Sequence, residues 1–215
     1  MLASMLDRAR LGRVAKRFAE QDWPVVPGAY LTSNAGRHAR ERRFDCGELG
    51  CRTVACHPAR SGWETAAPLS VPDVAQWWRT HPYTVLLATG HAFDVLEVPA
   101  TLGRAALLGD GYVAARGPVA VAPGGRWMWF VRPGHGLLPE LAQQRDVVLH
   151  ELGSWVPAPP SPQFGGRVRW ELAPEQHGWR PAQPNAVQRL MLDALNARRA
   201  AAVRDIVWRP VTWAT

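Results

Sequence analysis

The sequence lacks several features that define large classes of proteins. No apolar run approaches the roughly 18 residues that a membrane span needs, and the best candidate, residues 83–88, stops at Thr89-Gly90. The 3 cysteines are an odd number and all lie between residues 46 and 56, which excludes a framework of disulfides. Basic and apolar residues alternate near the N-terminus, unlike a secretory signal. We therefore expect a cytoplasmic protein without membrane association.

Lysine is almost absent, because Lys16 is the only one and arginine supplies the remaining basic residues. The 215 residues carry 25 Lys and Arg against 18 Asp and Glu, a net charge of +7. A GC-rich genome explains this bias, and phosphate binding is the alternative, since arginine contacts phosphate through two parallel hydrogen bonds. The 11 tryptophans also have two interpretations, burial in a core or stacking on bases.

Helical and strand patterns in the first half of the chain are short and well separated. Residues 5–21 repeat apolar side chains with the period of a helix, and Ser70 followed by Asp73 is a helix-start signal. Two apolar runs, residues 83–88 and 93–98, predict strands that form a hairpin or lie next to each other in a sheet. This half therefore predicts helices packed against a few strands.

The second half continues with more strands and a final helix. A turn at residues 123–125 predicts a strand on each side, and further strands are expected within 146–158 and 167–172. Asn185 and Gln188 form a capping-box pattern for a helix that ends near residue 202. Strands in the middle with helices at the ends indicate the α+β class. We expect a domain at residues 1–180, with a Cys/His loop at 31–62, and a C-terminal helix and tail at 181–215.

The polar segment 31–62 contains every cysteine and predicts a long insertion without regular structure. Its cysteines and a histidine are spaced as Cys-x4-Cys-x4-Cys-His, and zinc binds four such ligands in a tetrahedron. His38 is a further candidate, since the adjacent Cys56 and His57 bind one ion together only across a sharp backbone turn. The expected structural zinc site is formed by Cys46, Cys51, Cys56 and His57. The alternative is a metal-free loop with three reduced thiols.

Several short motifs follow one another in a recognisable order. They are Trp23–Pro27 after an amphipathic helix, the Cys/His loop, Trp77-Trp78, Ala88-Thr89-Gly90, Gly124-Gly125-Arg126 and Val156–Ser161. In this order they resemble the N-terminal domain of the bifunctional DNA primase–polymerases, of the archaeo-eukaryotic primase superfamily, over residues 8–175. The resemblance implies a mixed sheet related to the RNA-recognition motif, with flanking helices. It also implies priming or extension of DNA strands from nucleoside triphosphates with divalent metal ions.

The resemblance places the catalytic positions as well. The family holds its metal ions with two acids at alternate positions of one strand, which project from the same face. Glu97 occupies the first position, but Pro99 occupies the second and cannot bind a metal through its side chain. Trp127 stands where the family has a histidine that contacts nucleotide phosphate, and a third acid is expected near Val148. We therefore expect a degenerate active site, in which Glu97 retains a metal role or forms an ion pair with an arginine.

Three functions follow from these observations. The first is a non-catalytic domain that binds nucleotide or nucleic acid. The second is an active nucleotidyltransferase using Mg or Mn, with Glu97 joined by Asp94 or Asp146. The third is a protein-interaction module whose C-terminal helix docks a partner. The residues expected to bind nucleotide or nucleic acid in the first case are Gly124, Gly125, Arg126, Trp127 and Arg132. Arg167, Arg169 and Trp129 are further candidates, since arginines interleaved with strand aromatics suit phosphate contact and stacking.

Overall fold

The computed structural model describes residues 2–32, 42–65 and 68–207. Its helices are α1 (Leu2–Ala19), α2 (Val71–Thr80), α3 (Ala100–Leu107), α4 (Pro139–Ala142) and α5 (Pro184–Val207), with short 3-10 helices η1 (Asp110–Ala115) and η2 (Pro174–His177). Its strands are β1 (Val25–Gly28), β2 (Tyr30–Thr32), β3 (Arg43–Asp45), β4 (Thr84–Ala88), β5 (Asp94–Pro99), β6 (Val119–Val121), β7 (Arg126–Val131), β8 (Val148–His150), β9 (Trp155–Pro157), β10 (Pro162–Gln163), β11 (Gly166–Arg167) and β12 (Arg169–Leu172).

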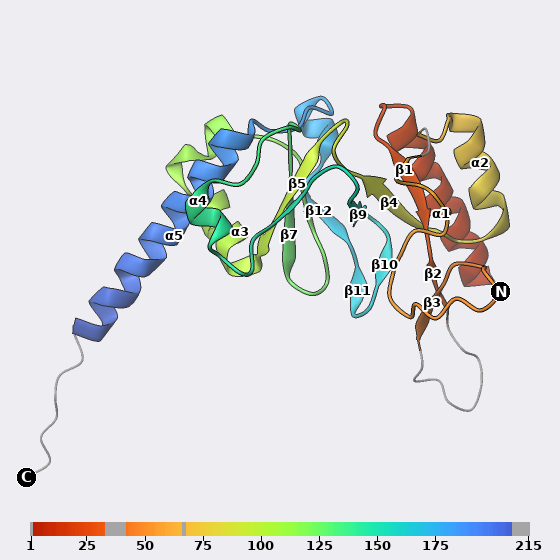
Figure 1. Ribbon diagram of the computed structural model, residues 1–215, viewed down its shortest axis with the longest axis horizontal. Coiled ribbons are helices and arrows are strands. Elements are labelled where there is room, and N and C mark those ends of the chain that lie inside the picture. Colours follow the sequence, from red (N-terminus) through yellow and green to blue (C-terminus); the bar gives the residue numbers. More distant parts are fainter. Residues whose placement is uncertain (1, 33–41, 66–67, 208–215) are drawn as a thin grey trace, which may run out of the picture.

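Two antiparallel sheets of different size organise these elements (Figure 1). The smaller sheet has the strand order β1-β4-β9, and the larger one has the order β12-β6-β7-β5-β8. Two short hairpins, β2-β3 and β10-β11, accompany them. The combination of helices with separate antiparallel sheets confirms the α+β class expected from the sequence.

Helices α1 and α2 cover the smaller sheet, and an aromatic core joins this part to the larger sheet. Helix α2 begins as predicted, because Ser70 and Asp73 form a complete capping box. The Trp23 ring stacks on Phe18 at 5.7 Å and on Phe130 of β7 at 5.2 Å between centroids. Burying such large rings contributes much of the stability of a domain. The two halves are therefore held together by a shared hydrophobic core.

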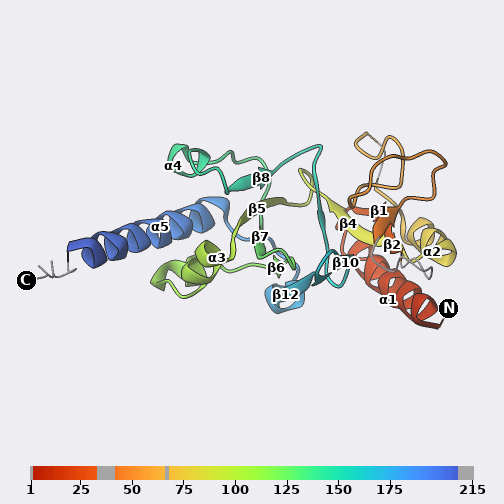
Figure 2. The same cartoon turned by 90° about the horizontal axis from the view of Figure 1, so that it is seen from below.

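The larger sheet is buried on both faces, which explains why β5 and β7 read as continuous apolar runs. Val95 faces the aromatic core, whereas Leu96 and Val98 face a second core built with α3 and α5. Trp127 and Trp129 of β7 also belong to this second core. Figure 2 shows the sheet between α1 and α2 on one side and α3 and α5 on the other.

Three local expectations require correction. Strands β4 and β5 form neither a hairpin nor an adjacent pair, because they belong to different sheets. The Cys/His loop is not wholly irregular, since it contains β3, which pairs with β2. The Gln188 side chain does not cap α5; it is buried and bonds the loop before α4, accepting from Leu138 N at 2.6 Å and donating to Gly136 O at 3.0 Å.

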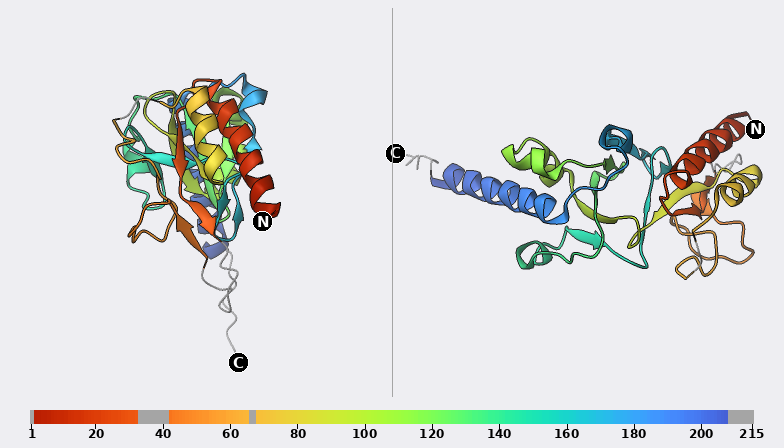
Figure 3. Two further views of the ribbon diagram at one scale, coloured as in Figure 1. Left: turned by 90° about the vertical axis from the view of Figure 1, so that its right-hand side faces the viewer. Right: turned by 90° about the horizontal axis from the view of Figure 1, so that it is seen from above.

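Helix α5 has two different surroundings along its length. Its first half places Val187, Leu190 and Met191 in the second core, together with α3. Its second half extends away from both sheets (Figure 3), and Arg198 donates to Thr101 Oγ1 at 3.2 Å. None of the described helices is both long enough and apolar enough to cross a bilayer. The tail expected beyond residue 207 lies outside the described residues.

Candidate functional site

Glu97 lies on β5, next to the edge strand β8 of the larger sheet, and both of its carboxylate oxygens have partners. Its Oε1 accepts a hydrogen bond from Arg126 Nε at 2.6 Å, and its Oε2 lies 3.0 Å from His150 Nε2. These contacts follow from strand pairing, because β5 lies between β7 and β8. The Glu97 side chain is 21% exposed and that of Arg126 is 29% exposed. The ion pair with an arginine that the sequence left open as an alternative is therefore present.

The contacts extend beyond the carboxylate on both sides. His150 Nδ1 lies 2.9 Å from Ser154 Oγ, and Arg126 also donates to the backbone oxygen of Asp146 at 2.9 Å. Burial by itself raises the pKa of Glu97, but the hydrogen bonds from His150 and Arg126 outweigh burial and lower that pKa. Glu97 is thus held in its charged form by neighbours that compensate the charge.

The positions at which the resemblance leads us to expect further acids carry apolar side chains. Pro99 ends β5 opposite Arg126, and Val148 of β8 lies directly opposite Glu97. Asp94 does not substitute for them, because it is buried on the other face, where Oδ2 accepts from Gly134 N at 3.0 Å. Asp146 is exposed and contacts Arg126 only through its backbone. Within the described ranges, the acids around Glu97 form no metal-binding cluster.

The residues expected to bind nucleotide do not form one surface. Gly124 and Gly125 make the turn between β6 and β7, and Gly125 adopts a positive φ of 75°. Arg126 follows this turn, whereas Arg132 follows the other end of β7, about 20 Å away at roughly 3.3 Å per residue. Trp127 is 2% exposed and packs in the second core, so its ring is not available for stacking. The burial of Trp127 does not fit the binding role expected for it, whereas Arg132 is exposed and its binding role stays a prediction.

His150 and Ser154 were not identified from the sequence. His150 stands 53 positions from Glu97, and only the pairing of β8 with β5 brings the two together. Strand pairing over such a distance leaves no local pattern, since any apolar strand satisfies the same alternation. No sequence signal identified this contact.

The Glu97 contacts predict a pH-dependent contribution to stability. We expect Glu97→Gln to lower the free energy of unfolding by about 1–2 kcal/mol at neutral pH. A carboxylate with a lowered pKa stabilises the fold above its unfolded value and loses this contribution as the pH falls through its folded pKa. The difference between the two proteins should therefore shrink below the ordinary pKa of 4.5. Urea unfolding from pH 7 to pH 3 measures it, and a constant difference over that range would contradict the assignment.

A second group of polar side chains lies in the Cys/His loop. The donor atoms of Cys46, Cys51 and His57 all lie within 4.8 Å of one another. Cys51 Sγ is 3.5 Å from His57 Nε2, and His57 Nδ1 lies 2.7 Å from the backbone oxygen of Ala55. A ring N–H bonded to a carbonyl is the usual way in which a ligating histidine is oriented, because it leaves the other nitrogen free for the metal. This cluster can hold a metal ion.

The thiols of the loop differ in their surroundings. Burial raises the pKa of the Cys46 thiol, whereas the backbone N–H of Thr53 lowers that of Cys51, which is exposed. Cys56 is turned away from the cluster toward Thr84 and Gln163, and burial raises its pKa to about 11. The structure therefore separates Cys56 from the ligand set expected from the sequence. His38 lies outside the described residues.

Comparison with known proteins identifies a family. Residues 15–186 match the family model described as bifunctional DNA primase/polymerase, N-terminal. None of the curated proteins matches the chain. The matched range contains the Cys/His loop, both sheets and the start of α5.

Proposed function

Because the chain belongs to the bifunctional DNA primase/polymerase N-terminal family, we propose that it is a primase–polymerase-like domain that has lost nucleotidyl transfer and retains binding to nucleotide or nucleic acid. One observation carries the first half of this proposal. Glu97 is the single acid on its face of the strand pair, and Arg126 and His150 occupy both of its oxygens.

The chemistry of phosphoryl transfer makes this arrangement unsuitable for catalysis. Two divalent ions about 3.5–4 Å apart must be held by carboxylate oxygens from more than one residue. Here the neighbours Pro99 and Val148 carry no carboxylate, so Glu97 is the single acid among these side chains. A metal ion at Glu97 would also have to displace Arg126 and lie beside its positive charge, which is unfavourable at this degree of burial.

Primer extension tests the loss of catalysis. We expect no incorporation of deoxynucleotides by the purified chain with Mg or Mn, at the same background as Glu97→Gln. The reason is that a single compensated carboxylate does not assemble two metal ions. Incorporation that disappears in Glu97→Gln would overturn the proposal in favour of an active enzyme with rearranged ligands, such as Asp146.

The retained-binding half is tested separately with single-stranded DNA. The net charge of +7 and the family's substrates support an electrostatic contact with phosphates, and such binding weakens as salt rises. We expect binding at low salt that is lost at high salt, measured by fluorescence anisotropy of labelled oligonucleotides and nucleotides. Absence of binding at low salt would reject this half and leave the loss of catalysis unaffected.

We further propose that the cluster of Cys46, Cys51 and His57 binds zinc as a structural ion. Zinc favours thiolate and imidazole ligands in a tetrahedral arrangement, and the donor set fits this preference. The ion would connect the two ends of the loop and would supply no chemistry to the sheet. Its contribution would be to folding, because binding a metal stabilises only the ordered form of such a loop.

A further inference from the structure

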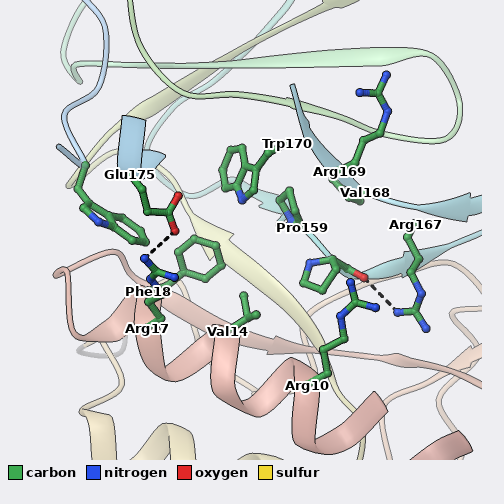
Figure 4. A pocket seen from close by; sticks show the side chains of 12 residues that line it. Arg10, Val14, Arg17, Phe18, Pro159, Arg167, Val168, Arg169, Trp170 and Glu175 are labelled. Atoms are coloured by element: carbon green, nitrogen blue, oxygen red, sulfur yellow. Dashed lines mark hydrogen bonds and ion pairs between the residues drawn. The ribbon is translucent and has the colours of Figure 1, made fainter. Parts of the chain in front are cut away.

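A cavity away from Glu97 is lined by both arginines and aromatic rings. It has a volume of about 450 Å³ and lies between α1 and the segment from β10 to η2. Strands β6 and β7 separate its edge strand β12 from β5, which carries Glu97. We name it the arginine–tryptophan pocket, after Arg10, Arg17, Arg167, Arg169, Trp170 and Trp179, which line it (Figure 4).

One end of the pocket is aromatic. Phe18 forms its floor and meets Trp179 edge-on at 5.9 Å and Trp170 at 6.3 Å between ring centroids. Both tryptophans are only partly buried, so their rings retain surface toward the pocket. The Arg17 guanidinium lies 5.6 Å from the centre of the Trp179 ring. This end offers flat apolar surfaces of the kind on which a base stacks.

The backbone at Trp179 is unusual for a bulky residue. Its φ is 61°, in the left-handed region that glycine or asparagine normally occupies. The conformation follows Gly178 at the end of η2, and Trp179 N donates to Pro174 O at 2.9 Å. Holding a bulky residue in this region costs stability, and such residues concentrate at binding sites. The turn thus places the Trp179 ring on the pocket at a cost to stability.

The other end of the pocket is basic. Arg10 is exposed and has no hydrogen bond or ion pair with any residue that the structure describes. Arg167 is held by both oxygens of Asp7, at 2.7 and 2.8 Å, and donates to Pro160 O at 3.1 Å. Arg169 pairs with Glu171 at 2.5 Å. Figure 4 shows Arg10 and Arg167 side by side, across from the aromatic end.

These acidic partners position the arginines without blocking them. The side chains of Asp7 and Arg167 are 37% and 36% exposed, and ion pairs at such exposure contribute little to stability. A phosphate can therefore replace a carboxylate at small cost, while Arg10 is already free to contact it. Arginine binds phosphate through two parallel hydrogen bonds, which makes it the preferred residue for this role.

We propose that the arginine–tryptophan pocket binds a nucleoside phosphate, with the base at Trp170 and Trp179 and the phosphate at Arg10 and Arg167. This inference rests on the proposed retention of nucleotide or nucleic-acid binding, and it moves the site away from the Gly124–Arg126 turn. The volume lies within the range of 300–1,000 Å³ typical of small-molecule sites. The same chemistry is present in a free nucleotide and in one unit of a DNA single strand, so the experiment separates these sources.

The test measures equilibrium binding of three probes to the full chain at low salt: a deoxynucleoside triphosphate, a labelled single-stranded DNA and inorganic triphosphate. Arg10→Ala should weaken binding of the nucleotide or of the strand about tenfold or more, the loss expected for a charged hydrogen bond. Arg13→Ala is the matched control, because Arg13 is also exposed on α1 but bonds only Ala9 O and does not line the pocket. It should change the affinity less than twofold. Thermal unfolding confirms that both variants are folded.

Base recognition is tested with Trp179. Trp179→Ala should weaken nucleotide or strand binding several-fold while leaving inorganic triphosphate unchanged, and Trp179→Phe should restore most of the loss because a phenyl ring also stacks. Equal binding of nucleotide and inorganic triphosphate, unaffected by Trp179→Ala, would reduce the pocket to an anion site and overturn the proposal.

The remaining outcomes separate the pocket from the proposed function. Binding by the wild type that Arg10→Ala and Arg13→Ala weaken equally would overturn the pocket and leave the retained binding standing. No binding of any probe at low salt would overturn both. If Arg10→Ala weakens binding of the deoxynucleoside triphosphate about tenfold and leaves binding of the oligonucleotide unchanged, the free nucleotide is the ligand. If it weakens binding of the oligonucleotide instead, the ligand is the DNA strand.

Discussion

Trp127→Ala is expected to lower the free energy of unfolding by about 3–5 kcal/mol, the usual cost of removing a fully buried aromatic ring. Trp127 is 2% exposed and lies in the second core, together with Leu102 and Met191. Gly103 of α3 packs directly on the ring, since a Cβ at that position would lie 2.7 Å from its carbons. Urea unfolding followed by circular dichroism measures the loss, because the other tryptophans complicate fluorescence.

Two further variants sharpen this prediction. Gly103→Ala should destabilise the protein by about 1–3 kcal/mol through overpacking against the same ring. Trp63→Ala is the control, because Trp63 is a partly exposed tryptophan in a turn, and its loss should cost clearly less. A Trp127→Ala protein with normal stability and lost nucleic-acid binding would contradict the buried position and restore the stacking role expected from the sequence.

Metal content should separate two cysteines that stand five positions apart. We expect about one equivalent of zinc in the wild type and in Cys56→Ser, and less than about a fifth of an equivalent in Cys51→Ser, because losing one thiolate from a small ligand set destroys such a site. The Cys51 thiol belongs to the cluster, whereas the Cys56 thiol is buried away from it. Elemental analysis of protein purified without chelators makes the measurement.

The controls distinguish the ligand sets. His57→Ala should behave as Cys51→Ser does, because its Nε2 faces the Cys51 sulfur at 3.5 Å. Loss of zinc in Cys56→Ser would favour the set of three cysteines that the spacing suggests. A wild-type content below about half an equivalent would defeat the zinc site altogether. In that case the three thiols are simply reduced.

Some parts of this fold could be predicted because the signal is local. The β6-β7 hairpin follows from the turn at residues 123–125, and the start of α2 follows from Ser70 and Asp73. Both depend on backbone conformations that a few neighbouring residues determine. By contrast, the pattern around Gln188 also fits a cap, but the side chain bonds the loop at Gly136 instead. A local motif does not reveal a distant competitor for the same hydrogen bonds.

The placement of strands in sheets could not be predicted. Strands β4 and β5 are separated by a short turn in which Gly90 has a φ of 97° and its Cα lies so close to Leu152 that a Cβ would be 2.3 Å away. The approach involves a residue 62 positions away, and the two strands on either side of the turn belong to different sheets. Alternation of apolar residues specifies a strand but not its partner.

The candidate sites also combine features that the sequence reveals with features that only the tertiary structure reveals. That Pro99 offers no carboxylate beside Glu97 was visible in the sequence, because it depends only on residue type and strand alternation. The choice between Cys56 and His57 was not visible, since either neighbour satisfies the spacing. Cys56 is buried beside Thr84, away from the cluster of Cys46, Cys51 and His57, and that contact belongs to the tertiary structure. Arg167 and Arg169 of the arginine–tryptophan pocket were candidates from the sequence, but only the tertiary structure brings them beside Arg10 and Arg17 of α1.

Pro99 belongs to two elements of the fold at once, and this affects how the domain can be redesigned. It ends β5 and is at the same time the N-cap of α3, where it provides no side-chain hydrogen bond. Aspartate is among the best residues at an N-cap, and gains about 1 kcal/mol there over a residue without an acceptor. An acid at this position is therefore compatible with the architecture, and Pro99→Asp would place a second carboxylate on the strand of Glu97 while supplying the cap that α3 lacks.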